Sequence, residues 1–138
     1  MICFVVPGTP VAKGRPRVGR SASGHVRTFT PARTVAYEGL IALAGQQAMA
    51  GAPPIEGAIS VTAFAHFPIP KSWPKKRLAA HADKPEYHLG RPDGDNILKA
   101  IGDGLNGVIW RDDSQIASAQ IVKLYGETPQ LVVMVRQL

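Results

Sequence analysis

Residues 91–116 read RPDGDNILKAIGDGLNGVIWRDDSQI and contain half of the acidic residues of the chain. The acidic residues are Asp93, Asp95, Asp103, Asp112 and Asp113, whereas the whole chain of 138 residues carries a net charge of +6. Carboxylates crowded into a small region repel one another unless one is protonated or a cation lies between them. Carboxylate oxygens are the ligands that a hard divalent cation prefers. The stretch therefore predicts a metal site in an otherwise basic protein.

The middle of this stretch predicts a helix that begins at Asp95 or Asn96 and ends at Leu105. Its apolar side chains recur at helical spacing on one face; they are Ile97, Leu98, Ile101 and Leu105. The opposite face carries Asp95, Lys99 and Asp103, spaced four residues apart. Gly102 and Gly104 each weaken such a helix by about 1 kcal/mol relative to alanine. We therefore expect packing, or a bound metal, to stabilise it, with Gly107 as its C-cap.

The carboxylates at the two ends of this helix can be brought to one ion. Asp93 and Asp95 lie two residues apart in an extended segment, which directs both side chains to the same side, and the helix dipole stabilises their charged forms. The helix is only about 15 Å long, so a return strand at residues 108–110 could bring Asp112 or Asp113 beside Asp93. Lys99 would then donate to charge developing on a phosphate, or pair with Asp95, worth a few tenths of a kcal/mol.

The alternatives to a catalytic metal site for these glycines and aspartates are structural, calcium-binding and dinucleotide-binding roles. A purely structural role as caps and turn formers fits Asp103 and one of the pair at 112–113, but not five aspartates in so short a window. An EF-hand loop would need Asp or Asn at position 97 and Glu at position 104. The G-x-G-x-x-G spacing of residues 102–107 falls at the end of a helix rather than between a strand and a helix, which excludes a dinucleotide site.

The remainder of the chain predicts a small α+β or mixed α/β fold. Apolar or alternating stretches predict strands at residues 2–6, 57–67, 115–125 and 131–135. A second helix should begin at Thr30-Pro31, bury Tyr37, Leu40, Ile41, Ala44 and Ala48, and end at Gly51. We expect one domain, residues 1–138, in which a mixed sheet is flanked by two main helices.

Two basic segments precede the aspartates. The first, between Met1 and Tyr37, has six basic residues and no acidic one; those in its Gly- and Pro-rich part are Lys13, Arg15, Arg17, Arg20 and Arg27. This part predicts a phosphate-binding loop or hairpin, with an ordinary solvated loop as the alternative. The second, residues 68–92, has five prolines and the cations Lys71, Lys75, Lys76, Arg77, Lys84 and Arg91. It predicts a long loop, with a short helix at 78–82, that contacts a nucleic-acid backbone while Trp73 contacts a base. The alternative is a mobile polar loop with Trp73 packed on the core.

The central motif resembles the signature of the RusA family of Holliday junction resolvases, the crossover junction endodeoxyribonucleases. The matching segments are RPDGDNILK at 91–99, DGLNG at 103–107 and WRDDSQI at 110–116, and GTPVAKGRPRVG at 8–19 is similar to the opening of many members. Ile97 stands where leucine is usual, and Gly102 and Gly104 stand where better helix formers are commoner.

The resemblance implies a small α/β homodimer that resolves four-way DNA junctions by paired symmetric nicking, in recombination and repair, with Mg²⁺ or Mn²⁺. It implies Asp93, Asp95 and Asp113 as metal ligands, Lys99 as the catalytic lysine, and a secondary metal role for Asp112. The cations of the two basic segments, with Lys99, would bind DNA. Cys3 is the only cysteine and no apolar run approaches about 20 residues, so we expect no disulfide, no membrane span and a cytoplasmic location. Two alternatives stay open: a nuclease for other branched DNA, and a DNA-binding module without catalysis.

Overall fold

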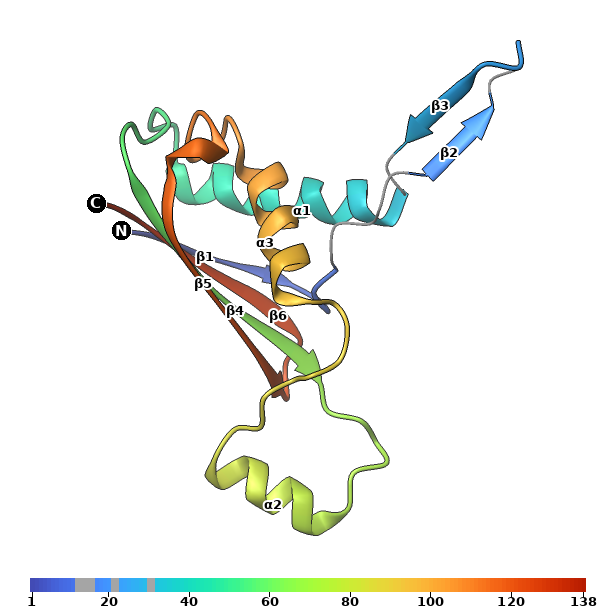
Figure 1. Ribbon diagram of the computed structural model, residues 1–138. Coiled ribbons are helices and arrows are strands. Elements are labelled where there is room, and N and C mark those ends of the chain that lie inside the picture. The colour runs from blue at the N-terminus through green and yellow to red at the C-terminus, as the bar shows by residue number, and fades with distance from the viewer. Residues whose placement is uncertain (12–16, 21–22, 30–31) are drawn as a thin grey trace.

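The computed structural model describes residues 1–11, 17–20, 23–29 and 32–138, with only the backbone for residues 17 and 26–29. Along the chain the elements are β1 (Ile2–Pro7), β2 (Arg17–Arg20), β3 (Val26–Phe29), α1 (Ala32–Met49), β4 (Ile59–Pro68), α2 (Lys75–Asp83), α3 (Gly94–Leu105), a 3₁₀ turn η1 (Asp113–Gln115), β5 (Ile116–Gly126) and β6 (Gln130–Gln137). The result is a small mixed α/β domain, as the sequence predicts (Figure 1).

A four-stranded mixed sheet with the order β1-β6-β4-β5 forms the centre of the molecule. Strands β1, β6 and β4 pair antiparallel, whereas β4 and β5 pair parallel. Because parallel neighbours need a crossover connection, the chain leaves β4, forms α2 and α3, and returns as edge strand β5. The predicted alternation of β4 is confirmed: the side chains facing the helices are buried at Ile59, Val61, Ala63, Ala65 and Phe67.

Helices α1 and α3 lie together on one face of this sheet (Figure 1). Two glycines allow their close approach. A Cβ atom at Gly104 would lie 3.0 Å from the Glu38 carbonyl oxygen and from Ile41 Cβ, and one at Gly45 would lie 2.6 Å from Leu105 Cδ2. Gly104, which weakens α3 as an isolated helix, therefore sits where α3 packs against α1.

The sequence prediction for the core face of α1 is partly wrong. The helix buries Thr34, Tyr37, Ile41, Gly45 and Met49, whereas Leu40 is 49% exposed. The predicted and the buried residues both recur every three or four positions. The buried face also includes a threonine and a glycine, which an apolar pattern does not select. Burial raises the pKa of the Tyr37 hydroxyl well above its ordinary value.

Four further boundaries differ from the predictions. Helix α2 occupies Lys75–Asp83, longer than the predicted 78–82, and lies at the end of the sheet away from α1 and α3, with side chains exposed or partly buried (Figure 1). Residues 108–110 form a turn that ends in an isolated bridge between Ile55 and Trp110, not a strand. Helix α3 begins at Gly94 rather than residue 95 or 96, with Asp93 as N-cap. Its C-cap is Asn106, followed by Gly107 at φ 78°.

The first basic segment contains the β2–β3 hairpin, which stands away from the main sheet (Figure 1). This matches the hairpin form of the prediction. Lys13 and Arg15 lie outside the described residues, as does the predicted helix start at Thr30-Pro31. No helix within residues 1–11, 17–20, 23–29 and 32–138 combines the length and apolarity of a membrane span.

Candidate active site along helix α3

The N-terminus of α3 presents two aspartates to solvent. Asp93 is the N-cap residue, with φ −71° and ψ 153°, and Asp95 lies in the first turn; both are exposed. In the part of the chain that the structure describes, the Asp93 carboxylate makes no capping hydrogen bond to the helix. Its oxygens are therefore not committed to the helix backbone.

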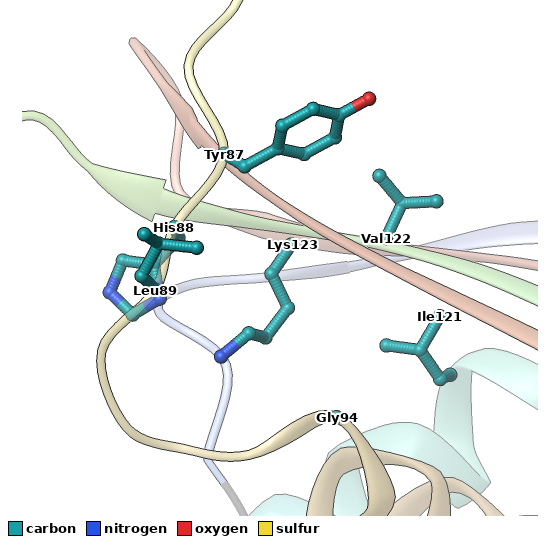
Figure 2. Close-up of a pocket in the computed structure, with 7 residues that line it drawn as sticks. All are labelled: Tyr87, His88, Leu89, Gly94, Ile121, Val122 and Lys123. Carbon is teal, nitrogen blue, oxygen red and sulfur yellow. The ribbon is translucent and has the colours of Figure 1, made fainter.

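The segment that leads into α3 is attached to edge strand β5. Backbone hydrogen bonds join Tyr125 N–H to the Glu86 carbonyl (3.0 Å) and His88 N–H to the Lys123 carbonyl (2.9 Å). Lys123 also reaches this segment with its side chain: Nζ donates to the carbonyls of Gly90 (2.7 Å) and Pro92 (2.9 Å). Figure 2 shows Lys123 extending from the strand toward the chain that precedes Gly94, in a pocket of about 300 Å³.

The return segment places Asp113 against the middle of α3. Its Oδ1 accepts a hydrogen bond from Nε1 of the fully buried Trp110 at 2.9 Å. A Cβ atom at Gly102 would lie 3.2 Å from Asp113 Oδ2 and 3.4 Å from Cγ, so the missing side chain at Gly102 makes room for this carboxylate. Trp110 and Gly102 together hold Asp113 on the face of α3 that also carries Asp95 and Lys99.

The ammonium group of Lys99 forms an ion pair with Asp103, at 3.3 Å between Nζ and Oδ1. The sequence predicted Asp95 as the structural partner of Lys99. That prediction is wrong, because Lys99 pairs with Asp103, one turn toward the C-terminus. The Lys99 side chain is 59% exposed. An exposed pair of this kind is weak, so Lys99 can exchange Asp103 for another anion at little cost.

Asp112 has a structural role in this arrangement. Its carboxylate caps the turn η1 by accepting from the Ser114 N–H (3.0 Å), while Gln115 Oε1 accepts from the Asp112 N–H (3.1 Å). The hydrogen bonds from Ser114 lower the pKa of Asp112. Gln115 Nε2 anchors the turn to the carbonyls of Ile55 (2.8 Å) and Gly57 (2.9 Å). Asp112 thus fits the turn-forming alternative better than the secondary metal role.

Two comparisons with known proteins bear on this site. The family model for "Endodeoxyribonuclease RusA" matches residues 7–136. The chain belongs to the RusA family. A curated relative, "Uncharacterized protein YqaN" of Bacillus subtilis (strain 168), is 36% identical over 140 residues, covering 99% of this chain and 96% of the relative. RusA membership implies endonuclease activity on Holliday junctions. It also raises the question of whether the residues of this site could hold a divalent metal ion.

Among the described residues, the RusA chain has carboxylates that suit a metal ion, but they are not placed around one point. Asp93 and Asp95 are exposed and Asp113 is partly buried. Carboxylate oxygens such as theirs are the donors that Mg²⁺ uses in proteins. Within the described residues, however, no group of three or more His, Cys, Asp or Glu side chains is placed to hold one ion. Asp113 packs at Gly102, seven residues beyond Asp95, or roughly 10 Å along the helix axis. The donor set therefore fits a hard divalent cation by chemistry, and gathering Asp93, Asp95 and Asp113 requires Asp113 or its segment to move.

The predicted DNA-binding cations of the second basic segment are all exposed, and one of them also binds other residues of the protein. Exposed side chains that can meet a DNA backbone belong to Lys71, Lys75, Lys76 and Arg91. Arg77 is engaged instead: its guanidinium binds both oxygens of Glu86 (2.7 and 3.0 Å) and lies 4.0 Å from the centre of the Trp73 ring. Arg77 lowers the pKa of Glu86. Arg77 thus links α2 to Glu86 and Trp73, and its expected phosphate contact stays a prediction.

Trp73 follows the alternative interpretation of this segment. It is buried and packs edge-on against Tyr125, with ring centroids 4.7 Å apart, so it cannot stack on a base in this conformation. The exposed aromatic side chain near the site is that of Tyr87. In the first basic segment Arg20 is exposed, whereas Arg17 and Arg27 are described only as backbone positions of the hairpin.

Sequence reasoning missed two residues that shape this site, Lys123 and Gly102. Each left a signal. Lys123 pairs in register with Ala65, a fully buried position, so it is a lysine on the core-facing side of a mostly apolar strand. Gly102 lies in the interior of a predicted helix, and a glycine in that position often marks close approach by another group.

Proposed function

We propose that this protein is a metal-dependent crossover junction endodeoxyribonuclease, which hydrolyses phosphodiester bonds of four-way DNA junctions by paired symmetric nicks in recombination and repair. The observation that carries the proposal is the RusA family match over residues 7–136, which includes the whole acidic segment. The geometry supports it, since Asp95, Lys99 and the Asp113 carboxylate at Gly102 follow one exposed face of α3.

Each residue of this face has a chemical role in the proposal. Asp93, Asp95 and Asp113 would hold Mg²⁺ or Mn²⁺, which when bound supplies an activated water and neutralises phosphate charge. Lys99 exchanges its weak pairing with Asp103 for a phosphate oxygen and donates to the charge that develops there. Trp110 orients Asp113 through its hydrogen bond to Oδ1, and Asp113 would have to shift from this position at Gly102 to join Asp93 and Asp95 at one ion.

The exposed cations around this face would bring the substrate to it. Positive charge for DNA phosphates would come from the exposed lysines on and just before α2, from Arg91 beside Asp93, and from Arg20 of the hairpin. We further propose that the protein acts as a homodimer, because a four-way junction has approximate two-fold symmetry and a two-fold dimer offers one site to each of two opposed strands. Sedimentation with and without junction DNA measures this directly.

The test is substitution of the proposed ligands. Asp93→Asn, Asp95→Asn and Asp113→Asn should each abolish cutting of a synthetic four-way junction with Mg²⁺ or Mn²⁺. Junction binding should stay intact or become tighter, because repulsion between carboxylate and phosphate falls. Asp83→Asn, at the end of α2, is the matched control and should cut normally. Cutting by the Asp95→Asn protein at the wild-type rate would show that the proposal is wrong.

One observation favours a second candidate, a DNA-binding module without catalysis: the described residues contain no assembled group of three metal ligands. Wild-type protein that binds the junction but never nicks it, with either metal, would support this candidate. Cleavage of the junction, a flap and plain duplex side by side separates a junction resolvase from a nuclease for other branched DNA, because only the resolvase prefers the junction.

A further inference from the structure

Lys123, on edge strand β5, holds the chain that leads to the first aspartates of α3. Its ammonium group donates to the carbonyl oxygens of Gly90 and Pro92, at 2.7 and 2.9 Å. These carbonyls lie three residues and one residue before Asp93. We propose that Lys123 is a positioning residue that sets the location of Asp93 and Asp95 for cation binding and catalysis. This inference rests on the proposed nuclease function.

Two contacts place Asp93 between fixed points on β5. On the N-terminal side, Lys123 holds the Pro92 carbonyl. On the C-terminal side, the first residue of α3 lies over the strand, close enough that a Cβ atom at Gly94 would be 3.7 Å from Ile121 Cγ2. Figure 2 shows Lys123 and Ile121 extending from the strand toward the turn at Gly94. The Asp93 backbone therefore depends on β5 for its position.

The chemistry of the lysine suits this task. An ammonium group has three N–H donors, so one side chain can bind two carbonyls that point to it from the same turn. Its position is otherwise unfavourable, because the register partner of Lys123 is the fully buried Ala65 and lysine is rarely placed on a core-facing position without a partner. A positive charge beside Asp93 also offsets the repulsion between neighbouring carboxylates.

The alternative is that Lys123 only stabilises the fold. A residue with only that role changes the fraction of folded molecules, whereas a positioning residue changes turnover and cation affinity in the folded protein. Groups that orient metal ligands typically contribute about 10- to 100-fold to affinity or activity. The two roles are separated by measurements at a temperature where wild type and variant are both fully folded by circular dichroism.

The experiment compares wild type with Lys123→Met, which keeps the unbranched shape and most of the length of the side chain and removes its charge and donors. Junction cleavage is measured with Mn²⁺, and Mn²⁺ binding without DNA is measured by electron paramagnetic resonance of the free ion. The expected result is a fall in kcat of about tenfold or more, a KM within about threefold of wild type, and Mn²⁺ affinity weakened about tenfold. Lys123→Arg should recover part of the loss, because it retains a charge and donors.

Two further variants make the result specific. Arg136→Met removes one exposed charge at the other end of the sheet, where Arg136 pairs in register with Ser60, and should leave kcat and Mn²⁺ affinity unchanged. Lys123→Cys, made in a Cys3→Ser background because Cys3 is exposed, can be alkylated with 2-bromoethylamine to a lysine analogue. Alkylation should restore both kcat and Mn²⁺ affinity.

The outcomes separate this inference from the proposed function. A folded Lys123→Met protein with wild-type kcat and Mn²⁺ affinity overturns the inference while junction cleavage itself stands. If the wild type cuts no branched DNA, the proposed function fails and the Mn²⁺ titration decides alone. Weaker binding by Lys123→Met than by wild type then supports the inference, and equal binding, including none by either protein, overturns it.

Discussion

Three glycines of α1 and α3 allow the stability of the protein to be separated from its activity. Replacing Gly39, Gly102 or Gly104 with alanine adds about 1 kcal/mol of helix propensity at each position. The surroundings of the added Cβ atom differ. At Gly39 it would have no described atom within 4 Å, at Gly102 it would meet the Asp113 carboxylate at 3.2 Å, and at Gly104 it would meet α1 at 3.0 Å.

The expected magnitudes follow from these distances. Gly39→Ala should stabilise the protein by about 1 kcal/mol and leave cleavage unchanged. Gly104→Ala overpacks two helices at a backbone oxygen, which costs roughly 1–3 kcal/mol, so the net change runs from neutral to a loss of about 2 kcal/mol. Gly102→Ala meets a side chain that can shift by a few tenths of an ångström, so its net stability change should lie between zero and a gain of about 1 kcal/mol.

The activity of Gly102→Ala should fall despite that stability. The shift moves the Asp113 carboxylate and strains its 2.9 Å hydrogen bond with Trp110. A misplacement of about 1 Å costs roughly 100-fold in rate, so a smaller shift should cost about tenfold. Urea unfolding gives the stabilities, and single-turnover cleavage of a four-way junction gives the rates. A Gly102→Ala protein that cuts at the wild-type rate, or that loses as much stability as Gly104→Ala, would refute the reasoning.

Three more predictions concern the surroundings of the site. Arg77 lowers the pKa of Glu86 below its ordinary value of 4.5, so the stabilising effect of their pair is complete above pH 4.5 and is lost as the pH falls through the lowered pKa. The difference in unfolding free energy between wild type and Glu86→Gln should therefore shrink on acidification from about pH 6 to about pH 3. A difference that stays constant over this range would contradict the prediction. Changing an exposed lysine that contacts a phosphate to alanine should make the negative slope of log K against log [salt] less steep by about 0.9. Titrations of junction binding at several salt concentrations measure this for Lys71, Lys75 and Lys76. Gln115→Ala leaves two backbone carbonyls without its amide donor and should lower the free energy of unfolding by about 1–3 kcal/mol; an unchanged urea midpoint would show that the turn does not need this anchor.

Periodicity predicted the parts of the fold that depend on one element at a time. The alternation of β4 appears in the structure as a buried face, and so does the apolar stripe of α3 except for Leu98, which is only partly buried. Side-chain direction follows directly from strand and helix geometry. The same approach failed for Leu40 of α1. Which of two adjacent apolar positions is buried depends on how close a neighbouring helix comes, and that approach is set by Gly45 and Gly104.

The sequence alone therefore determined the family, the acidic segment and the elements on which the aspartates lie, because these are written in local composition and spacing. Only the tertiary structure decided that Trp73 is buried, that Arg77 is bound to Glu86, and that Asp113 packs at Gly102. It also brought Lys123 to the carbonyls before Asp93, across about 30 residues of chain. Such contacts join segments that are distant in sequence, and their geometry exists only after β5 has returned to the edge of the sheet.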